Sequence, residues 1–93
     1  MTRGELRAEA IERDGQWCRF PECELTRAAN PLEMAHLKGA GSGGSKYRDH
    51  IDNVVMLCKF HHDWLDGRLN KGRRFENEII LREVTGIRWE EPR

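Results

Sequence analysis

The stretch that decides the fold is Asn53-Val54-Val55-Met56-Leu57-Cys58-Lys59-Phe60-His61-His62-Asp63-Trp64-Leu65-Asp66. It begins as a short apolar run, which predicts a strand to about Leu57, and continues with the charged and aromatic pattern of a helix. Cys58 and His61 have the two-residue gap of one half of a zinc site. The stretch therefore predicts a pair of metal ligands at a strand-to-helix turn.

The two adjacent histidines point in different directions if this segment is helical. Consecutive helical residues are about 100° apart around the axis, so His61 and His62 cannot easily serve one metal ion. His62 and Asp66 are four residues apart and share a helical face, with Cβ atoms roughly 5–6 Å from each other. We expect His61 to face inward to a structural metal ion and His62 to face outward to a working one.

Length, composition and charge limit the classes to which this protein can belong. The chain has 93 residues, 34% of them charged, and a net charge of zero, which predicts one small soluble domain over residues 1–93 and no general basic clamp for nucleic acid. No apolar run approaches the roughly 20 residues of a membrane span, and the start lacks the apolar segment of a signal peptide. We therefore expect an intracellular, cytoplasmic protein with no membrane partner. The three cysteines cannot all pair with one another, which favours thiolate metal ligands over a disulfide framework.

The partner for Cys58 and His61 is the segment Trp17-Cys18-Arg19-Phe20-Pro21-Glu22-Cys23. Two cysteines around a proline resemble a metal knuckle, because the turn brings two thiolates to one point. Cys18, Cys23, Cys58 and His61 then form a Cys3His set that uses every cysteine of the chain. We expect a closed, structural zinc site, the staple that a domain this small needs. The alternative is a group of buried, reduced cysteines.

Further helices and a strand frame this centre. Residues 2–13 begin with a capping-box pattern and end before Gly15, so they predict a packing helix. Residues 32–37 alternate apolar and polar and predict a strand. Apolar residues recur at helical spacing from 75 to 87, with Gly86 as a stop, which favours a C-terminal helix over strands.

Two segments are rich in cations and contain no acid. Residues 38–48 are also rich in glycine and lack the pattern of a nucleotide P-loop, which favours contact with a phosphate backbone; the alternative is a solvated connection between two strands. Residues 68–74 are equally compatible with phosphate contact and with a solvated face. The candidate nucleic-acid-binding residues are Lys38, Lys46, Arg48, Arg68, Lys71, Arg73 and Arg74.

Taken in order, these motifs resemble the HNH endonuclease family. The order is the cysteine knuckle, a strand ending in Ala35-His36-Leu37, a glycine-rich loop, Asn53, and then Leu57-Cys58-x-x-His61-His62. The chain is most similar to the small zinc-stapled HNH proteins of phages and prophages, over roughly Cys18 to Gly67. The resemblance implies an α+β protein with a ββα-metal (HNH, or His-Me finger) core at about 17–67, a structural zinc site, and flanking N-terminal and C-terminal helices.

The resemblance also assigns roles. It implies that His36 is the general base, that Asn53 orients it, and that His62 binds a catalytic divalent cation such as Mg²⁺, Mn²⁺ or Ni²⁺. A histidine with an ordinary pKa near 6.5 can take the proton of an attacking water at neutral pH if its other nitrogen is held by an acceptor. Asp66 is a candidate second ligand; the alternative is an exposed aspartate in the last helical turn. The implied reaction is hydrolysis of DNA phosphodiester bonds, by nicking or by cleavage of low specificity.

Some residues depart from the family pattern. Many members carry Asp or His as a metal ligand directly before the base, and here that residue is Ala35, which can bind nothing. Glu33 shares its strand face but is a full pleat repeat away, so we do not expect it to be a replacement. Asp49-His50 resembles the opening of some HNH sites, but it lies too close to Asn53, so we expect His50 in a surface loop. Ala35 leaves a second function open: a catalytically weak, zinc-stapled module that binds nucleic acid or a phage packaging partner, a role that only the resemblance implies.

Overall fold

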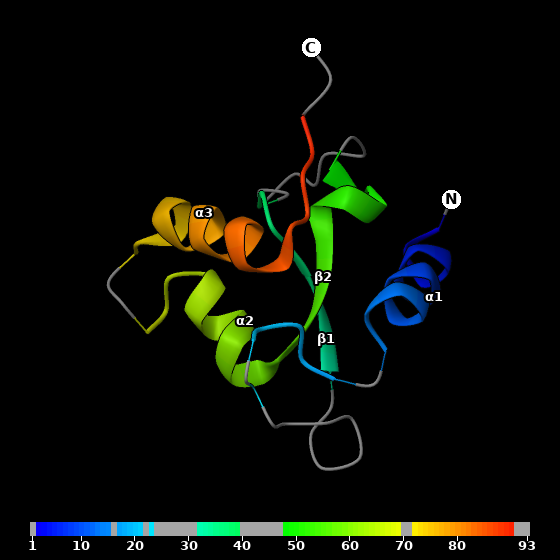
Figure 1. Cartoon of the computed structure of the whole chain (residues 1–93), viewed down its shortest axis with the longest axis horizontal. Helices are drawn as coiled ribbons and strands as arrows, with labels where there is room; N and C mark the ends of the chain where they lie inside the picture. Colours follow the sequence, from blue (N-terminus) through cyan, green and yellow to red (C-terminus); the bar gives the residue numbers. More distant parts are fainter. Residues whose placement is uncertain are drawn as a thin grey trace.

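The computed structural model describes residues 2–15, 17–21, 23, 32–39, 48–69 and 72–90. These residues form an α+β domain with the helices α1 (Arg3–Asp14), α2 (Lys59–Leu65) and α3 (Arg74–Thr85), the 3-10 turn η2 (Ile51–Asn53), and an antiparallel sheet of β1 (Leu32–His36) and β2 (Val54–Cys58). In Figure 1, α1 lies on one side of the two strands, and α2 and α3 lie on the other. The predicted α+β class is confirmed, as are the predicted helices and strands.

The pairing of β1 with β2 places the strand that carries His36 beside the strand that leads into His61 and His62. β1 and β2 pair from Leu32 opposite Cys58 to His36 opposite Val54. Every residue of β2 is buried, because helices cover both of its faces, and this burial explains its unbroken apolar sequence. The core is completed by apolar residues of the other elements: Leu6, Ala10, Leu32, Ala35, Leu37, Leu65, Leu81 and Ile87.

The helix α1 begins and ends as the sequence predicts. Its capping box is formed, because the Glu5 backbone N–H donates to the Thr2 hydroxyl at 3.1 Å and the Thr2 backbone N–H donates to the Glu5 carboxylate at 3.2 Å. Gly15 ends the helix with a φ of 80°, a conformation that glycine adopts at little cost. Leu6 and Ala10 lie one turn apart and form its buried stripe.

Polar side chains at the end of α1 form hydrogen bonds with the backbone N–H and C=O groups on the outer edge of β2. The buried Asp14 carboxylate accepts a hydrogen bond from the Met56 backbone N–H at 3.1 Å. The Arg13 guanidinium donates to the Val54 carbonyl at 2.6 Å, and the Arg19 backbone N–H donates to the Met56 carbonyl at 2.9 Å. A two-stranded sheet is marginal by itself and leaves its edges unpaired. These side chains and one backbone group therefore take the place of a third strand.

The C-terminal helix is present, but its apolar residues do not all face the core. Phe75 is 73% exposed and Ile79 is 51% exposed, whereas Leu81 is fully buried. Asn77 is buried beside Leu81 and donates its amide N–H to the Trp64 carbonyl at 2.6 Å. Helical spacing thus identified the helix correctly, although it is Asn77 and Leu81 that dock it onto α2. Among the described residues, no helix has both the length and the apolar composition that crossing a membrane requires.

Replacing Asp14 by alanine tests the edge of β2. We expect Asp14→Ala to lower the free energy of unfolding by about 3 kcal/mol, because the Met56 N–H and the Arg13 guanidinium would lose their buried acceptor. Urea denaturation followed by circular dichroism measures this difference. Glu12→Ala, an exposed change on the same helix, should alter stability by less than about 0.5 kcal/mol; equal effects of the two variants would contradict this interpretation.

Candidate metal centre and candidate active site

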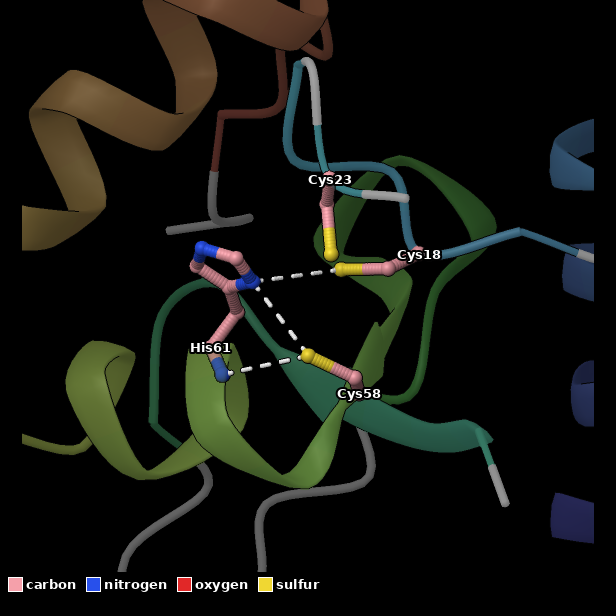
Figure 2. A group of neighbouring side chains, drawn as sticks. All are labelled: Cys18, Cys23, Cys58 and His61. Carbon is pink, nitrogen blue, oxygen red and sulfur yellow. Dashed lines mark hydrogen bonds between the residues drawn. The ribbon is translucent and has the colours of Figure 1, made fainter. Parts of the chain in front are cut away.

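Four side chains converge where β2 meets α2. The sulfur atoms of Cys18, Cys23 and Cys58 and a ring nitrogen of His61 all lie within 4.8 Å of one another. Two of the cysteines come from the segment after α1, and the other two residues from the β2–α2 turn (Figure 2). Cys58 also caps α2, because its Sγ accepts the His61 backbone N–H at 3.5 Å. The predicted Cys3His set is therefore brought together.

The spacing within this Cys3His group suits a tetrahedral metal ion. His61 Nδ1 is 3.5 Å from the Cys18 sulfur and 3.3 Å from the Cys58 sulfur. With metal–sulfur bonds of about 2.3 Å and metal–nitrogen bonds of about 2.1 Å, tetrahedral sulfur and nitrogen ligands are about 3.6 Å apart. The group could therefore hold a metal ion with Nδ1 as its nitrogen donor. Four protein ligands would fill such a site and leave no position for a substrate.

Aromatic side chains fix the orientation of the His61 ring. Phe20, from the cysteine knuckle, stacks on it with ring centroids 4.2 Å apart and planes 8° apart. Phe60 meets the same ring edge-on at 5.2 Å. Trp64 meets Phe20 edge-on at 5.3 Å and so supports the stack from α2. The rotamer that points Nδ1 at the sulfurs is thus packed in place before any metal binds.

Burial disfavours charge in this group when no cation is present. It raises the pKa of the Cys18 thiol to about 12 and lowers the pKa of the His61 imidazole. A metal ion reverses this preference for the thiols, because it binds thiolates and neutral imidazole. Binding of a metal ion to this group would therefore release the thiol protons.

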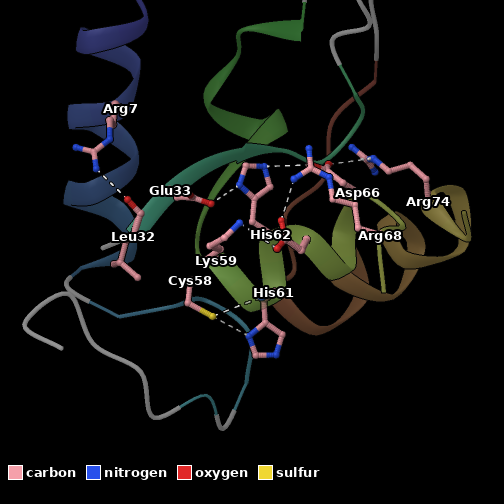
Figure 3. Close-up of polar contacts among 11 residues, drawn as sticks. Arg7, Leu32, Glu33, Cys58, Lys59, His61, His62, Asp66, Arg68 and Arg74 are labelled. Carbon is pink, nitrogen blue, oxygen red and sulfur yellow. Dashed lines mark hydrogen bonds and ion pairs between the residues drawn. The ribbon is translucent and has the colours of Figure 1, made fainter. Parts of the chain in front are cut away.

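His62 points away from the Cys3His group, as the sequence predicts. Its Nδ1 is 2.8 Å from Oε1 of Glu33 on β1, and its Nε2 is 3.5 Å from Oδ2 of Asp66 (Figure 3). A carboxylate on one ring nitrogen is a common feature of metal-binding histidines, whose other nitrogen is then the ligand. Glu33, which sequence analysis set aside, thus contacts the ring of the candidate ligand.

A half-buried arginine continues this line of contacts. Arg74, the first residue of α3, lies with its Nε 3.7 Å from Oδ1 of Asp66 and donates from Nη2 to the His36 carbonyl at 2.6 Å. An unbroken series of polar contacts therefore runs from Glu33 through His62, Asp66 and Arg74 to the backbone of His36. We call these residues the polar chain. It joins the predicted cation ligand to the predicted base.

The ring of His36 is held by Asp49. Its Nε2 is 2.6 Å from Oδ1 of Asp49, whose other oxygen accepts from Nε of Arg3 at 3.1 Å. Burial alone would raise the pKa of Asp49, but the hydrogen bonds from His36 and Arg3, together with their charges, lower it on balance. Asp49 is thus ionised at neutral pH, and the Nε2–H of His36 donates to it. The two histidine rings contact separate carboxylates, and Arg74 links the Asp66 carboxylate to the backbone carbonyl of His36 and not to its ring.

Asn53 has a different task from the one that the sequence suggested. Its fully buried side chain accepts from the Lys38 backbone N–H at 2.9 Å and donates to the carbonyls of Lys38 at 3.1 Å and Arg48 at 3.0 Å. Arg82 of α3 also donates to it, at 2.8 Å. Asn53 therefore holds together the two ends of the 38–48 segment, while the contact to His36 that was expected from Asn53 comes from Asp49.

Three contact residues were not identified from the sequence, and each left only a weak signal. Glu33 is an acid in a strand next to buried neighbours, and Asp49 was passed over together with His50, which is indeed an exposed residue capping η2. Arg74 was one cation among several. Of the predicted nucleic-acid contacts, Lys46 and Lys71 lie outside the described residues. Others contact the protein itself: Arg48 with the Gly39 carbonyl, Arg68 with Asp63, and Arg73 with Glu76.

The described residues thus contain two groups of side chains that could bind ions or take part in a reaction, the Cys3His group and the polar chain. They lie on either side of α2. Comparisons with protein-family models, with curated proteins and with solved structures find no match.

Substituting one thiol tests the metal centre. We expect the protein to carry one transition-metal ion and Cys18→Ser to lose it. Because binding of this kind contributes on the order of 10 kcal/mol to folding, comparable with the whole stability of a small domain, the variant should be largely unfolded. Elemental analysis and circular dichroism measure both effects. Lys59→Ala, an exposed change beside Cys58, should keep the metal and the fold; a folded, metal-loaded Cys18→Ser protein would contradict the assignment.

Proposed function

We propose that this chain is a metal-dependent DNA endonuclease of the HNH type, which nicks or cuts phosphodiester bonds with little sequence preference. The observation that carries the proposal is the polar chain, since it connects a histidine held by a carboxylate at the end of β1 to a second imidazole–carboxylate pair on α2. In this proposal β1, β2 and α2 form the ββα-metal unit that the sequence motifs imply, and the protein acts on DNA in the cytoplasm.

The ion in the Cys3His group is proposed to be Zn²⁺. Three thiolates and one imidazole in a closed tetrahedral set are typical ligands of structural zinc. Its role is to join the knuckle of Cys18 and Cys23 to the start of α2. That junction sets the rotation of α2 and so the direction of His62.

His36 is proposed to act as the general base. Because Asp49 accepts the hydrogen bond from Nε2–H, the lone pair of His36 is on Nδ1, which can take the proton of an attacking water. The Asp49 carboxylate then stabilises the imidazolium that results. Attack of that water on phosphorus in line with the leaving 3′ oxygen breaks the P–O3′ bond and leaves a 5′ phosphate.

A divalent cation, Mg²⁺, Mn²⁺ or Ni²⁺, would be held by His62 Nε2 and Asp66. The two side chains lie four residues apart on α2, with Nε2 and Oδ2 3.5 Å apart, close enough to bind one ion after a small rotation. Such an ion would stabilise negative charge on the phosphate and on the leaving oxygen. Glu33 would keep His62 in the tautomer that can bind it.

The His36 side chain provides the direct test of catalysis. We expect His36→Ala to reduce plasmid nicking by about 10²- to 10⁴-fold, the usual contribution of a general base, while the protein stays folded and keeps its zinc. His50→Ala, at an exposed neighbouring histidine, should retain activity. Equal nicking by wild type and His36→Ala would contradict the proposal and indicate a contaminating nuclease or another base.

A milder effect is expected when the partner of the base is changed. Asp49→Asn keeps the shape of the side chain but removes the charge that stabilises protonated His36, so the nicking rate should fall by about 10- to 100-fold. The matched control is Asp52→Asn, an exposed change three residues further on, which should have little effect. If Asp49→Asn nicks at the wild-type rate, Asp49 does not support the base.

A second function is favoured by one observation. Ala35 is completely buried and supplies no ligand at the position before the base, while both ring nitrogens of His62 already face carboxylates. This arrangement suits a catalytically silent module that binds DNA or a phage packaging protein. The same nicking assay separates the two functions, because the silent module would bind DNA without cutting it in any of the three cations.

A further inference from the structure

Arg74 comes from outside the β1–β2–α2 unit but contacts the end of β1 and the residue that follows α2. Its guanidinium is beside Asp66 and the His36 carbonyl, and it passes so close to the chain at Gly39 that a Cβ added there would be 3.6 Å from Nη2. Its side chain is only 25% exposed. Burial lowers its pKa, but an arginine remains charged at neutral pH. The site therefore contains a permanent positive charge next to a proposed cation ligand.

One donor of this arginine has no acceptor. Among the described residues, Nη1 of Arg74 is the buried side-chain atom without a hydrogen-bond partner. A buried donor without a partner costs free energy, and such groups in native proteins call for an explanation such as a missing ligand. The guanidinium is planar and carries several donors, and the side chain is partly exposed although Nη1 is not. A phosphate oxygen that reaches the exposed part is a suitable acceptor for it.

The charges of the polar chain give a second indication. With His62 neutral, Glu33, Asp66 and Arg74 together carry a net charge of −1. A divalent cation alone would change that to +1 in a partly buried site, and its repulsion by the guanidinium would weaken binding. One phosphodiester, with a charge of −1, would restore neutrality. The charges of these residues, of one divalent cation and of one phosphodiester thus sum to zero.

We propose that Arg74 makes binding of the divalent cation at His62 and Asp66 and binding of a DNA phosphodiester mutually dependent. Without DNA, the guanidinium repels the cation and holds one oxygen of Asp66. With DNA, a phosphate between the two positive charges removes that repulsion. This inference rests on the proposed function, since it concerns the same site. By linkage, the cation must strengthen phosphate binding by the same factor by which phosphate strengthens cation binding.

The test measures binding and not cleavage. Mn²⁺ is titrated into the zinc-loaded protein, with and without a short DNA duplex whose phosphorothioate linkages resist hydrolysis, and paramagnetic broadening of the His62 ring signals reports occupancy of this site. The proteins are wild type, Arg74→Gln, Arg74→Lys and the control Arg88→Gln, which removes an exposed charge outside the site. Zinc content and melting temperature establish that each variant is folded.

We expect the duplex to strengthen Mn²⁺ binding to wild type and to Arg88→Gln by about tenfold, within the usual range of coupling between two sites. In Arg74→Gln, Mn²⁺ should bind several-fold more tightly without DNA, and the duplex should add little. Arg74→Lys retains the charge and should retain most of the coupling, which keeps the test valid if the glutamine variant fails to fold.

Two results would overturn the inference. One is weaker Mn²⁺ binding by Arg74→Gln without DNA, as expected if Arg74 only holds Asp66 in place. The other is coupling of the same size in wild type and Arg74→Gln. These outcomes are distinct from failure of the proposed function, which is an absence of nicking by wild type: a protein with Arg74-dependent coupling that does not cut DNA would retain this inference and lose the nuclease.

Discussion

The convergence of three thiols and one imidazole at the end of β2 is the constraint on which the rest of the site depends. α2 has only seven residues, and a helix this short does not form by itself in water. Its first turn is capped by the Cys58 sulfur, and the ring of His61 in that turn stacks on Phe20 of the cysteine knuckle. An ion bound by these four side chains would join the knuckle to the helix and fix the helix rotation. The direction of His62 follows, because it is the next residue.

Side chains from other parts of the fold then form the contacts that hold His62, Asp66 and His36. Glu33 of β1 reaches His62, and Arg74 of α3 reaches both Asp66 and the end of β1. Asn53 gathers the ends of the 38–48 segment, so that Asp49, directly after it, can reach His36. These contacts are buried or half-buried and mostly carry charge, which makes them stronger than exposed ion pairs and makes their geometry specific. The proposed base and the proposed cation-binding pair can therefore share a very small scaffold.

The sequence predicts most of the helices and strands correctly. It does not predict which side chains contact the site residues. The capping box of Thr2 and Glu5, the strand–helix switch at Cys58 and the stop at Gly86 are short-range signals, and each predicted its element correctly. The Cys3His set was predictable because metal ligands have few chemical alternatives. Asp49 and Arg74 act on His36 from 13 and 38 residues away along the chain, and no periodicity reports such a contact. The exposed face of α3 was missed for a related reason, since spacing identifies a helix but not the side that a neighbour covers.

X-ray absorption at the zinc edge tests the central claim most directly, because it counts the ligand types around the bound ion. The account predicts three sulfur ligands at about 2.3 Å and a single imidazole nitrogen at about 2.0–2.1 Å, with the same spectrum after His62→Ala. Scattering from two imidazoles, or a spectrum that changes when His62 is removed, would show that the adjacent histidines share one ion. In that case the separation of a structural centre from a working site, on which the proposed function rests, would be wrong.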